Sequence, residues 1–226
     1  MTTERMERII GILSDSFFPI VKAGLAYTIP LTLITFTLGL ILAFLTALAR
    51  LSGFQPLVLI ARFYVWVFRG TPLLVQLFIL FYGFPSLGIT LDPFPTAVIG
   101  FTLNKGAYSS EIIRAAILSI PKGQREAAYS IGMTRWQAMR RIILPQAVRV
   151  AIPPLGNSFI ALTKDTSLAA TITVTEMFQK GQQFASVTYE PLWLYTEVAA
   201  VYLLFSTVLS YFQNRLERRY DRSVAT

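Results

Sequence analysis

The sequence contains no cysteine and no histidine among its 226 residues, and only 14% of them are charged. Without cysteine there can be neither a disulfide framework nor a thiolate metal site, and without histidine the usual imidazole base and metal ligand are missing. These absences exclude most of the chemistry of soluble enzymes. Because 54% of the chain is hydrophobic, the charged residues are too few to cover an ordinary globular surface. The composition therefore predicts a protein surrounded largely by lipid.

Long apolar runs predict an all-α integral membrane protein. Ala23 to Ala49 runs for 27 residues without a charge, which exceeds the ~20 apolar residues that cross a ~30 Å hydrocarbon core as a helix. The motif Ala47-Leu48-Ala49 resembles a signal-peptide cleavage site, but the run is too long for a signal peptide and further apolar runs follow it. We expect about five transmembrane helices: Ala23–Ala49, Leu57–Tyr82, Pro95–Leu118, Val148 to about Thr163, and Pro191–Phe212.

The basic residues between these spans predict the orientation of the chain. The smaller set on one side is Arg5, Arg8, Lys22, Lys164 and Lys180. The larger set on the other side is Arg50, Arg62, Lys122, Arg125, Arg135, Arg140, Arg141, Arg149, Arg215, Arg218, Arg219 and Arg222. The positive-inside rule places the larger set in the cytoplasm, with the N-terminus periplasmic and the C-terminus cytoplasmic. The net charge of +8 then reflects topology and anionic lipid rather than nucleic acid.

This orientation predicts three regions. They are an N-terminal interfacial or periplasmic segment, 1–22, a transmembrane domain, 23–216, and a cytoplasmic tail, 217–226. Within the transmembrane domain, the segment 125–145 is the least membrane-like stretch. Gly132 suits the left-handed cap of one short helix, and Thr134 followed by Gln137 is a capping-box start for the next. An amphipathic helix lying on anionic lipid explains the same pattern. A helix-turn-helix DNA reader fits less well, because both ends are tied closely to membrane spans.

A motif in this segment has a specific spacing. It consists of Glu126-Ala127-Ala128, three residues, Gly132, nine residues, Ile142, one residue, and Leu144-Pro145. This motif resembles the EAA signature of the permease subunits of bacterial ABC importers, and the resemblance implies that 125–145 is a coupling segment. Further stretches are similar to the polar amino acid permease family, from about Gly24 to Leu216. They are Phe68–Leu73, Ala107-Tyr108 with Glu111 and Arg114, Gly123-Gln124, and Lys164–Leu168.

Within that family the chain is most similar to the L-cystine permeases. The similarity lies in Gly88-Ile89, Leu91-Asp92-Pro93 and Asn157–Ile160. The resemblance implies a type I ABC importer permease fold in the bacterial inner membrane, with a cytoplasmic EAA coupling helix. Lys105 departs from the neutral residue expected beside Asn104 in cystine permeases, so arginine, histidine and glutamine remain alternative substrates.

The resemblance also implies partners. The coupling helix would dock on a separate ATP-binding subunit through Glu126, Ala127, Ala128 and Gly132, with two such subunits for each transporter. A second permease copy or a paralogue, a periplasmic amino-acid-binding protein and membrane lipid complete the expected partners, and no nucleic acid is expected. The chain has no Gly-Lys-Ser or Gly-Lys-Thr, so it lacks a P-loop and is not expected to be an enzyme. ATP and magnesium are expected on the partner ATPase, and no cofactor on this chain.

Polar residues inside apolar spans are costly, so they are candidates for contact with the substrate. Arg69 beside Thr71 offers a guanidinium fork at a proline-interrupted helix. Asn104 and Tyr108 lie at i and i+4 on one helix face, next to Lys105. The last group, which in the resembling family lies in the substrate passage, is Lys164, Asp165, Thr166 and Ser167.

Structural roles without substrate contact are the alternatives for Arg69 and for Lys164 to Ser167. Arg69 can snorkel or seal a dimer interface, and Lys164 to Ser167 has the composition of an exposed loop. Glu111 and Arg114, three residues apart, are expected to form a structural ion pair. A membrane protein that docks a partner without transport needs no charges inside its spans, and a passive channel needs no ATPase-docking signature. The importer interpretation explains both features.

Overall fold

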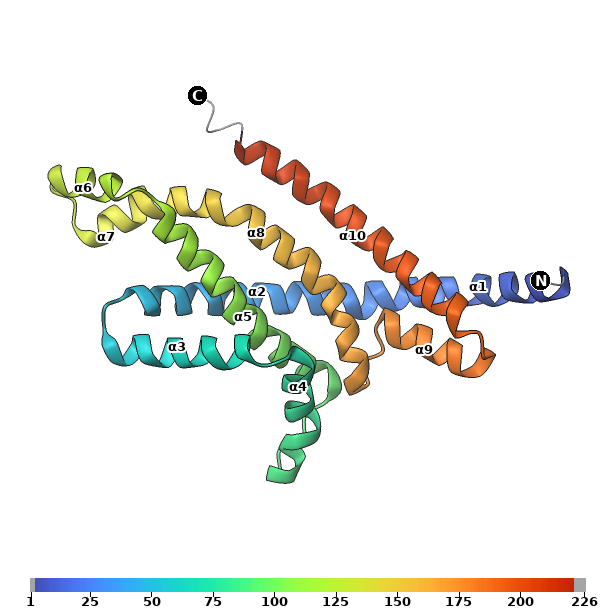
Figure 1. Cartoon of the computed structure of the whole chain (residues 1–226). Coiled ribbons are helices and arrows are strands. Elements are labelled where there is room, and N and C mark those ends of the chain that lie inside the picture. The colour runs from blue at the N-terminus through green and yellow to red at the C-terminus, as the bar shows by residue number, and fades with distance from the viewer. Residues whose placement is uncertain (1–2, 222–226) are drawn as a thin grey trace. The chain divides into compact units, whose positions relative to one another are not determined.

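The computed structural model of the chain describes residues 3–221, and every regular element in them is helical, with no β-strand (Figure 1). The label α marks an α-helix, and η marks a π or 3₁₀ turn. In chain order the elements are α1 (Thr3–Ala23), η1 (Gly24–Thr28), α2 (Ile29–Leu51), α3 (Gln55–Gly70), α4 (Leu73–Phe78), η2 (Ile79–Gly83), η3 (Phe84–Leu87), α5 (Pro93–Ser119), α6 (Lys122–Ser130), α7 (Arg135–Ala138), η4 (Met139–Ile143), α8 (Leu144–Asp165), η5 (Thr166–Ile172), α9 (Met177–Thr188) and α10 (Pro191–Asp221). The predicted all-α class is confirmed.

The chain divides into two compact units, each built from stretches that are distant in sequence. Unit 1 consists of Met1–Phe36, Leu73–Phe101 and Ile160–Tyr211. Unit 2 consists of Thr37–Pro72, Thr102–Phe159 and Phe212–Thr226. In unit 1, Leu31, Leu77, Phe101 and Leu162 are fully buried in one apolar core. In unit 2, Ile117 and Ile143 centre another core, which joins α5 to η4 and α8.

Within residues 3–221, two helical stretches are long and apolar enough to cross a membrane by length and composition, Thr3–Leu51 and Pro191–Arg215. A third possible span is α3 taken together with the segment from α4 to η3, which is bent. The helices α5 and α8 have 27 and 22 residues, so both could reach across a bilayer, but each carries three charged residues. The expectation of about five transmembrane helices therefore stays a prediction.

The first helix begins well before the predicted boundary at residue 23. It runs from Thr3 to Leu51 through the π turn η1. Hydropathy alone could not predict this start, because tertiary packing stabilises α1: Ile9 and Ile20 are buried, and Ile20 shares a core with Met177 of α9. The interfacial or periplasmic position of residues 1–22 stays a prediction.

Proline explains where these helices change their winding. Three π turns, η1, η2 and η4, occur in the described residues, and in each the next residue donates its N–H to the carbonyl five positions back. The residue after that donor is Pro30, Pro85 or Pro145. A proline has no N–H, and its ring clashes with the carbonyl four positions back. The wider π turn accommodates the ring while the helix continues.

Pro72 has a stronger effect, because it ends α3. Thr71 before it is extended, with φ −120° and ψ 147°, as expected for a residue that precedes proline. The predicted span Leu57–Tyr82 is therefore two helical segments, α3 and the segment that begins with α4, and not one continuous helix.

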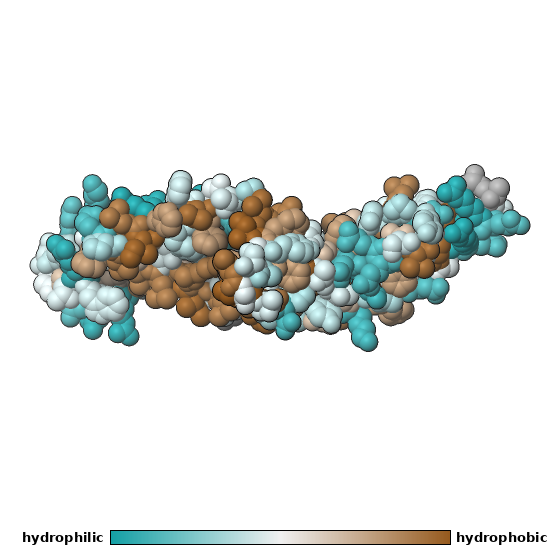
Figure 2. Space-filling model, turned by 90° about the horizontal axis from the view of Figure 1, so that it is seen from below, coloured by the Kyte–Doolittle hydropathy of each residue, from teal (hydrophilic) through white to brown (hydrophobic). Residues whose placement is uncertain are grey.

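Large apolar side chains are exposed along α2, α3 and α10, among them Ile41, Phe63, Trp66 and Leu203. Figure 2 shows apolar side chains over much of the face that it presents. Water does not favour so much exposed apolar surface, whereas lipid does.

Candidate functional site

The C-terminal end of α3, which carries Arg69, is held by two side chains of α5. Asn104 Nδ2 donates to the Phe68 carbonyl at 3.3 Å, and the Tyr108 hydroxyl lies 3.5 Å from the Arg69 carbonyl. A helix that ends at a proline leaves its last carbonyls without helical partners. Asn104 and Tyr108 thus share one helix face, as predicted, and they position the turn that presents Arg69.

The Arg69 side chain lies among groups of the same unit. Its guanidinium carbon is 5.2 Å from the centroid of the Tyr108 ring, within the range of a cation–π contact. Its Nη1 lies 3.8 Å from Glu111 Oε1, and the side chain remains 42% exposed. The Thr71 hydroxyl donates to the Val67 carbonyl at 2.8 Å, which extends the support of this helix end.

Glu111 lies at the centre of an ionic cluster that the sequence predicts only in part. Arg114 binds it through Nε at 3.0 Å and Nη2 at 2.8 Å, which confirms the predicted pair. Arg50, from the end of α2, also forms an ion pair with Glu111, and Arg69 is the third arginine around it. Sequence spacing gave no signal for these two contacts, because they join different helices. Three guanidinium groups thus face one carboxylate, and the cluster has a positive surplus.

Asn104 and Lys105 are buried within unit 2. A Cβ added to Gly39 would lie 3.3 Å from Lys105 Cβ, so α2 and α5 approach closely here. Tyr108 is exposed. The predicted lining role of all three residues stays a prediction, and Tyr108 is the one of them with an open side chain.

The segment Lys164 to Ser167 joins the end of α8 to η5 in unit 1. Lys164 is exposed and Ser167 is half-buried. The Ser167 hydroxyl donates to the Lys164 carbonyl at 2.8 Å. Thr166, one of the predicted substrate contacts, is fully buried, and its hydroxyl donates to the Thr163 carbonyl at 2.7 Å. The reason is the 3₁₀ turn, which directs Thr166 into the core of unit 1.

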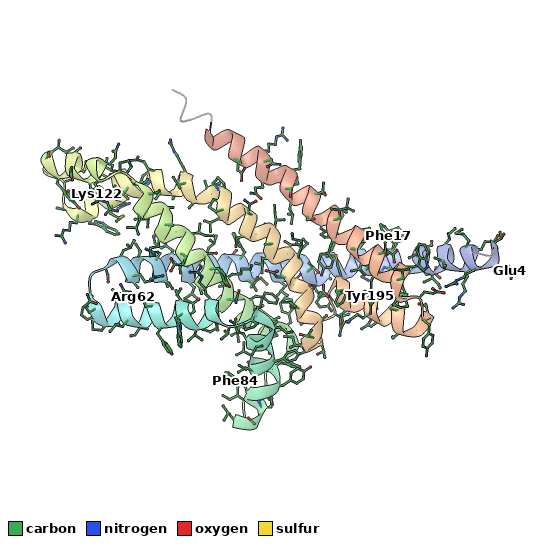
Figure 3. All side chains as sticks on the ribbon, viewed as in Figure 1. Glu4, Phe17, Arg62, Phe84, Lys122 and Tyr195 are labelled. Carbon is green, nitrogen blue, oxygen red and sulfur yellow. The ribbon has the colours of Figure 1, made fainter. Side chains whose placement is uncertain are left out.

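Lys164 and Ser167 line a cavity of about 500 Å³, together with Tyr195, Tyr202 and Ser206 of α10. Tyr195, which Figure 3 labels, also packs on Phe178 of α9 with ring centroids 5.7 Å apart. The cavity offers one cation, several hydroxyl groups and aromatic walls. This combination suits a small zwitterion with a carboxylate.

A buried carboxylate lies beside this cavity, and sequence reasoning missed it. Glu176 is fully buried and accepts a hydrogen bond from the Tyr202 hydroxyl. Glu176 also caps α9 by accepting from the Gln179 N–H at 2.9 Å. A lone glutamate between apolar stretches was the available signal. Because α10 supplies Tyr202, this pair fixes one wall of the cavity.

The coupling segment folds as its local signals predict. Figure 3 labels Lys122 at the start of α6. After α6, Gly132 is left-handed with φ 79°, and the Met133 N–H reaches the Ala128 carbonyl at 3.1 Å in a Schellman turn. Thr134 and Gln137 form the reciprocal capping box, at 3.2 and 2.8 Å. The predicted cap and capping box are confirmed.

Two features of the segment differ from its sequence pattern. The second helix is not short, since α7 continues through η4 into α8 without a break. Glu126, Ala127 and Gly132 are exposed, whereas Ala128 is buried against its own unit. A docking partner can therefore reach the first three directly, and the docking role of all four residues stays a prediction.

No group of three or more carboxylate side chains that could hold a metal occurs in residues 3–221. The polar clusters described above combine cations with carboxylate, hydroxyl or aromatic groups, so they can bind charged organic groups.

Residues 36–222 match the family described as "Binding-protein-dependent transport system inner membrane component". The chain belongs to this family. It is 55% identical over 95% of its length to the L-cystine transport system permease protein TcyB of Bacillus subtilis (strain 168), covering 92% of that protein. It is 38% identical to the glutamine transport system permease protein GlnP of Escherichia coli (strain K12), over 89% of this chain and 93% of that protein.

Solved structures agree with this assignment. The fold matches the crystal structure of an amino acid ABC transporter with histidines at a TM-score of 0.83 and 33% identity, over 97% of this chain and 99% of that chain. An inward-facing structure of the MetNI methionine ABC transporter matches at a TM-score of 0.68 over the same shares, and its 19% identity supports the fold alone. The chain therefore has the ABC importer permease fold and is a component of the inner membrane. Family membership implies an ATPase and a substrate-binding protein as partners.

Proposed function

We propose that this chain is the permease subunit of an ATP-driven importer that moves L-cystine across the bacterial inner membrane. The observation that carries this proposal is the 55% identity to an L-cystine permease over 95% of the chain. Relatives named for glutamine and arginine transport are less similar, at 38% and 37%. Glutamine, arginine and histidine are the alternative substrates. A docking protein without transport is a weaker alternative, because it does not account for the ionic cluster around Glu111.

ATP hydrolysis belongs to a separate subunit in this proposal. Two ATP-binding subunits carry ATP and magnesium, and a second permease copy or a paralogue completes the membrane part. A periplasmic binding protein delivers the amino acid. The N-terminus is periplasmic and the C-terminus cytoplasmic, with lipid around the apolar helices. The surplus of basic residues in the predicted cytoplasmic segments supports this orientation.

The coupling segment transmits the nucleotide cycle. Exposed Glu126 and Ala127 and the open turn at Gly132 support docking on the ATP-binding subunit, and Ala128 supports the same helix from its buried side. Closure of the ATP-binding subunits on ATP draws the coupling segments together. This movement rocks the paired permeases from inward-facing to outward-facing, and the binding protein then releases its cargo.

In unit 2, Arg69 binds a substrate carboxylate. Its fork is partly exposed, and the positive surplus around Glu111 favours an added anion. Thr71 at the same helix end and Tyr108 of α5 complete this contact surface. Asn104 and Lys105 tune which side chain is accepted, so we expect Lys105→Thr to alter the preference among amino acids.

In unit 1, the segment Lys164 to Ser167 supplies a second set of contacts. Lys164 attracts a carboxylate and Asp165 an ammonium, while Ser167 offers a hydroxyl at the edge of the cavity. Thr166 holds the turn through its buried hydroxyl. Cystine carries two amino acid groups joined by a disulfide. Since the chain has no cysteine, it offers no thiolate that could exchange with that disulfide.

Transport in proteoliposomes tests this proposal. The full chain is reconstituted with the ATP-binding subunit and binding protein of its own transport system, and ATP-dependent uptake of radiolabelled L-cystine is measured. We expect unlabelled cystine to suppress uptake, and arginine, histidine and glutamine to leave most of it. Lys105→Thr should change this competition profile. Uptake of glutamine or arginine without uptake of cystine would overturn the assignment of substrate.

A further inference from the structure

A cavity of about 670 Å³ lies in unit 2, between the coupling segment and the end of α2. Arg125 and Arg135 line it together with Tyr129 and Trp136, and no acidic residue does. Leu51, at the end of α2, is one of the apolar lining residues. The cavity thus combines two cations, two amphipathic aromatic residues and an apolar side. We call it the basic cavity.

The sequence of α2 indicates at what level of the bilayer the basic cavity lies. Its uncharged run ends at Ala49, and Arg50 follows. Leu48 and Leu51, on either side of that boundary, both line the basic cavity. It therefore lies where a hydrocarbon core gives way to headgroups, at the level where tryptophan and tyrosine are enriched. Tyr129 is 45% exposed and Trp136 is 63% exposed.

Not all hydrogen-bond donors of Arg125 have a partner in the described part of the chain. Its Nη2 donates to the Ile117 carbonyl at 3.3 Å, which anchors the side chain to the end of α5. Its Nε is buried and has no hydrogen-bond partner in the described part of the chain. Arg135 is exposed. A phosphate group offers several acceptor oxygens and negative charge, and the planar fork of arginine matches it in geometry.

The apolar side of the basic cavity leads toward lipid. Leu45 is 59% exposed, and it lies three residues before Leu48, on the same face of α2. The acyl chain of a lipid that contacts Leu48 can therefore continue along α2 past Leu45. A soluble protein partner offers no such chain, whereas a phospholipid has both a phosphate and an acyl chain.

We propose that the basic cavity binds an anionic phospholipid, with its headgroup phosphate at Arg125 and Arg135 and an acyl chain on Leu48 and Leu51. This site does not depend on the identity of the transported amino acid. It ties the coupling segment to the headgroup layer, so the charge of the surrounding lipid sets how firmly that segment is held. Anionic lipid on the cytoplasmic face supplies such headgroups.

Tryptophan quenching tests the site directly. Trp66→Phe and Trp193→Phe leave Trp136 as the sole tryptophan of the three in the chain. The full chain is placed in nanodiscs that contain phosphatidylglycerol or phosphatidylcholine with brominated acyl chains. We expect phosphatidylglycerol to quench Trp136 more strongly. Arg125→Gln and Arg135→Gln should each lower the apparent affinity for it roughly 5-fold, from ~1 kcal/mol for each basic residue at the surface.

Arg140→Gln is the matched control, because it removes one exposed cation of the same segment that does not line the basic cavity. It should leave the preference for phosphatidylglycerol intact. Inorganic phosphate should not displace the lipid; displacement would assign the cavity to free phosphate and overturn the lipid proposal. Equal quenching by both lipids, or no effect of Arg125→Gln combined with Arg135→Gln, would also overturn it.

Native mass spectrometry of the assembled transporter gives a second readout. Phosphatidylglycerol should stay bound when the ATP-binding subunits are present, and the combined Arg125→Gln and Arg135→Gln variant should lose it. Loss of the lipid from the assembled wild-type transporter would show that the ATPase fills the cavity instead. Neither measurement uses transport, so either can fail while the proposed function stands.

Discussion

The charge balance around Glu111 is the main feature of the chain at the scale of single residues. Arg50, Arg69 and Arg114 all lie against this carboxylate, from the ends of α2 and α3 and from α5 itself. Two of the three arginines, Arg50 and Arg69, are therefore positioned by an ion pair with a residue on another helix. Removal of the carboxylate leaves like charges together in a partly buried setting, where their repulsion is stronger than in bulk water.

Glu111→Gln should destabilise the protein by about 1–3 kcal/mol, because hydrogen bonds to charged groups are lost and three cations remain. The thermal midpoint of the purified chain in detergent measures this loss. Glu126→Gln makes the same chemical change on the exposed face of α6 and should alter stability by less than ~1 kcal/mol. Equal effects of the two variants would contradict a central role for Glu111.

Asp165→Asn should weaken transport rather than stability, because the proposal gives this carboxylate a substrate ammonium as partner. Loss of a direct charge-assisted hydrogen bond costs about 1.5–3 kcal/mol, or roughly 10- to 150-fold in affinity. Initial uptake at limiting cystine measures it, and affinity of the isolated binding protein for cystine serves as the unaffected control. Normal uptake at limiting substrate would remove Asp165 from the site.

Residues that interact locally could be predicted, and residues that interact across helices could not. The capping box joins Thr134 to Gln137, three positions further along the chain, so its bonds follow from the sequence alone. The ion pair of Glu111 with Arg114 is local in the same way. The contact of Arg50 with Glu111 needs α2 and α5 to lie side by side, and no spacing encodes that. The burial of Thr166 could not be predicted, because the winding of η5 decides the direction of its side chain.

At the scale of elements, the turn between α6 and α7 is the place where a substitution best tests docking of the ATP-binding subunit. Gly132 is left-handed, and nothing within 4 Å would meet an added Cβ. A substitution there therefore strains the backbone without a clash inside the chain. Any larger effect must come from a partner that covers the turn.

Gly132→Asp should leave the chain inserted and folded but should reduce both uptake and copurification of the ATP-binding subunit. A carboxylate buried without a partner at the docking surface costs ~3 kcal/mol or more, whereas the left-handed backbone costs ~1–2 kcal/mol at most. Gly123→Asp places the same group on α6, the helix that precedes this turn, with open space and no positive φ, and it should couple nearly normally. Normal uptake by Gly132→Asp would refute the docking assignment.

Helix boundaries were predictable where proline or a polar residue fixes them. The expected Pro95–Leu118 became α5, Pro93–Ser119, and the expected start of the last helix at Pro191 is confirmed. The break at Pro72 follows from its missing N–H. The start of α1 at Thr3 was not predictable from hydropathy, because contacts with α9 stabilise it.

At the scale of the whole molecule, orientation is the prediction that matters most. A reporter that is active only in the cytoplasm should be active when fused after Arg222, which lies outside the described residues. The basic residues favour this side by the positive-inside rule. A fusion after Ser52, between α2 and α3, should behave in the same way. Activity of a periplasmic reporter at either place would reverse the topology.

Composition and motifs sufficed for the fold class and the family, since both depend on repeated local features spread over most of the chain. The division into two compact units was not predictable. Each unit assembles three separated stretches, and α2, α5, α8 and α10 each contribute to both. Polarity alone also leaves the number of membrane crossings open, because α5 and α8 carry charges within helices that are long enough to span.

The π turns before Pro30, Pro85 and Pro145 have a consequence for the two sides of each helix. Each such turn holds more residues than an α turn does, so side chains beyond it are rotated by roughly 100° from the position that a 3.6-residue count gives. A lipid-facing stripe traced along α1 therefore arrives on a different face of α2. Likewise, α7 and α8 can point unrelated faces toward ATPase and membrane although they form one uninterrupted helix. A π turn before proline thus lets one continuous helix place its apolar residues on different faces before and after the turn.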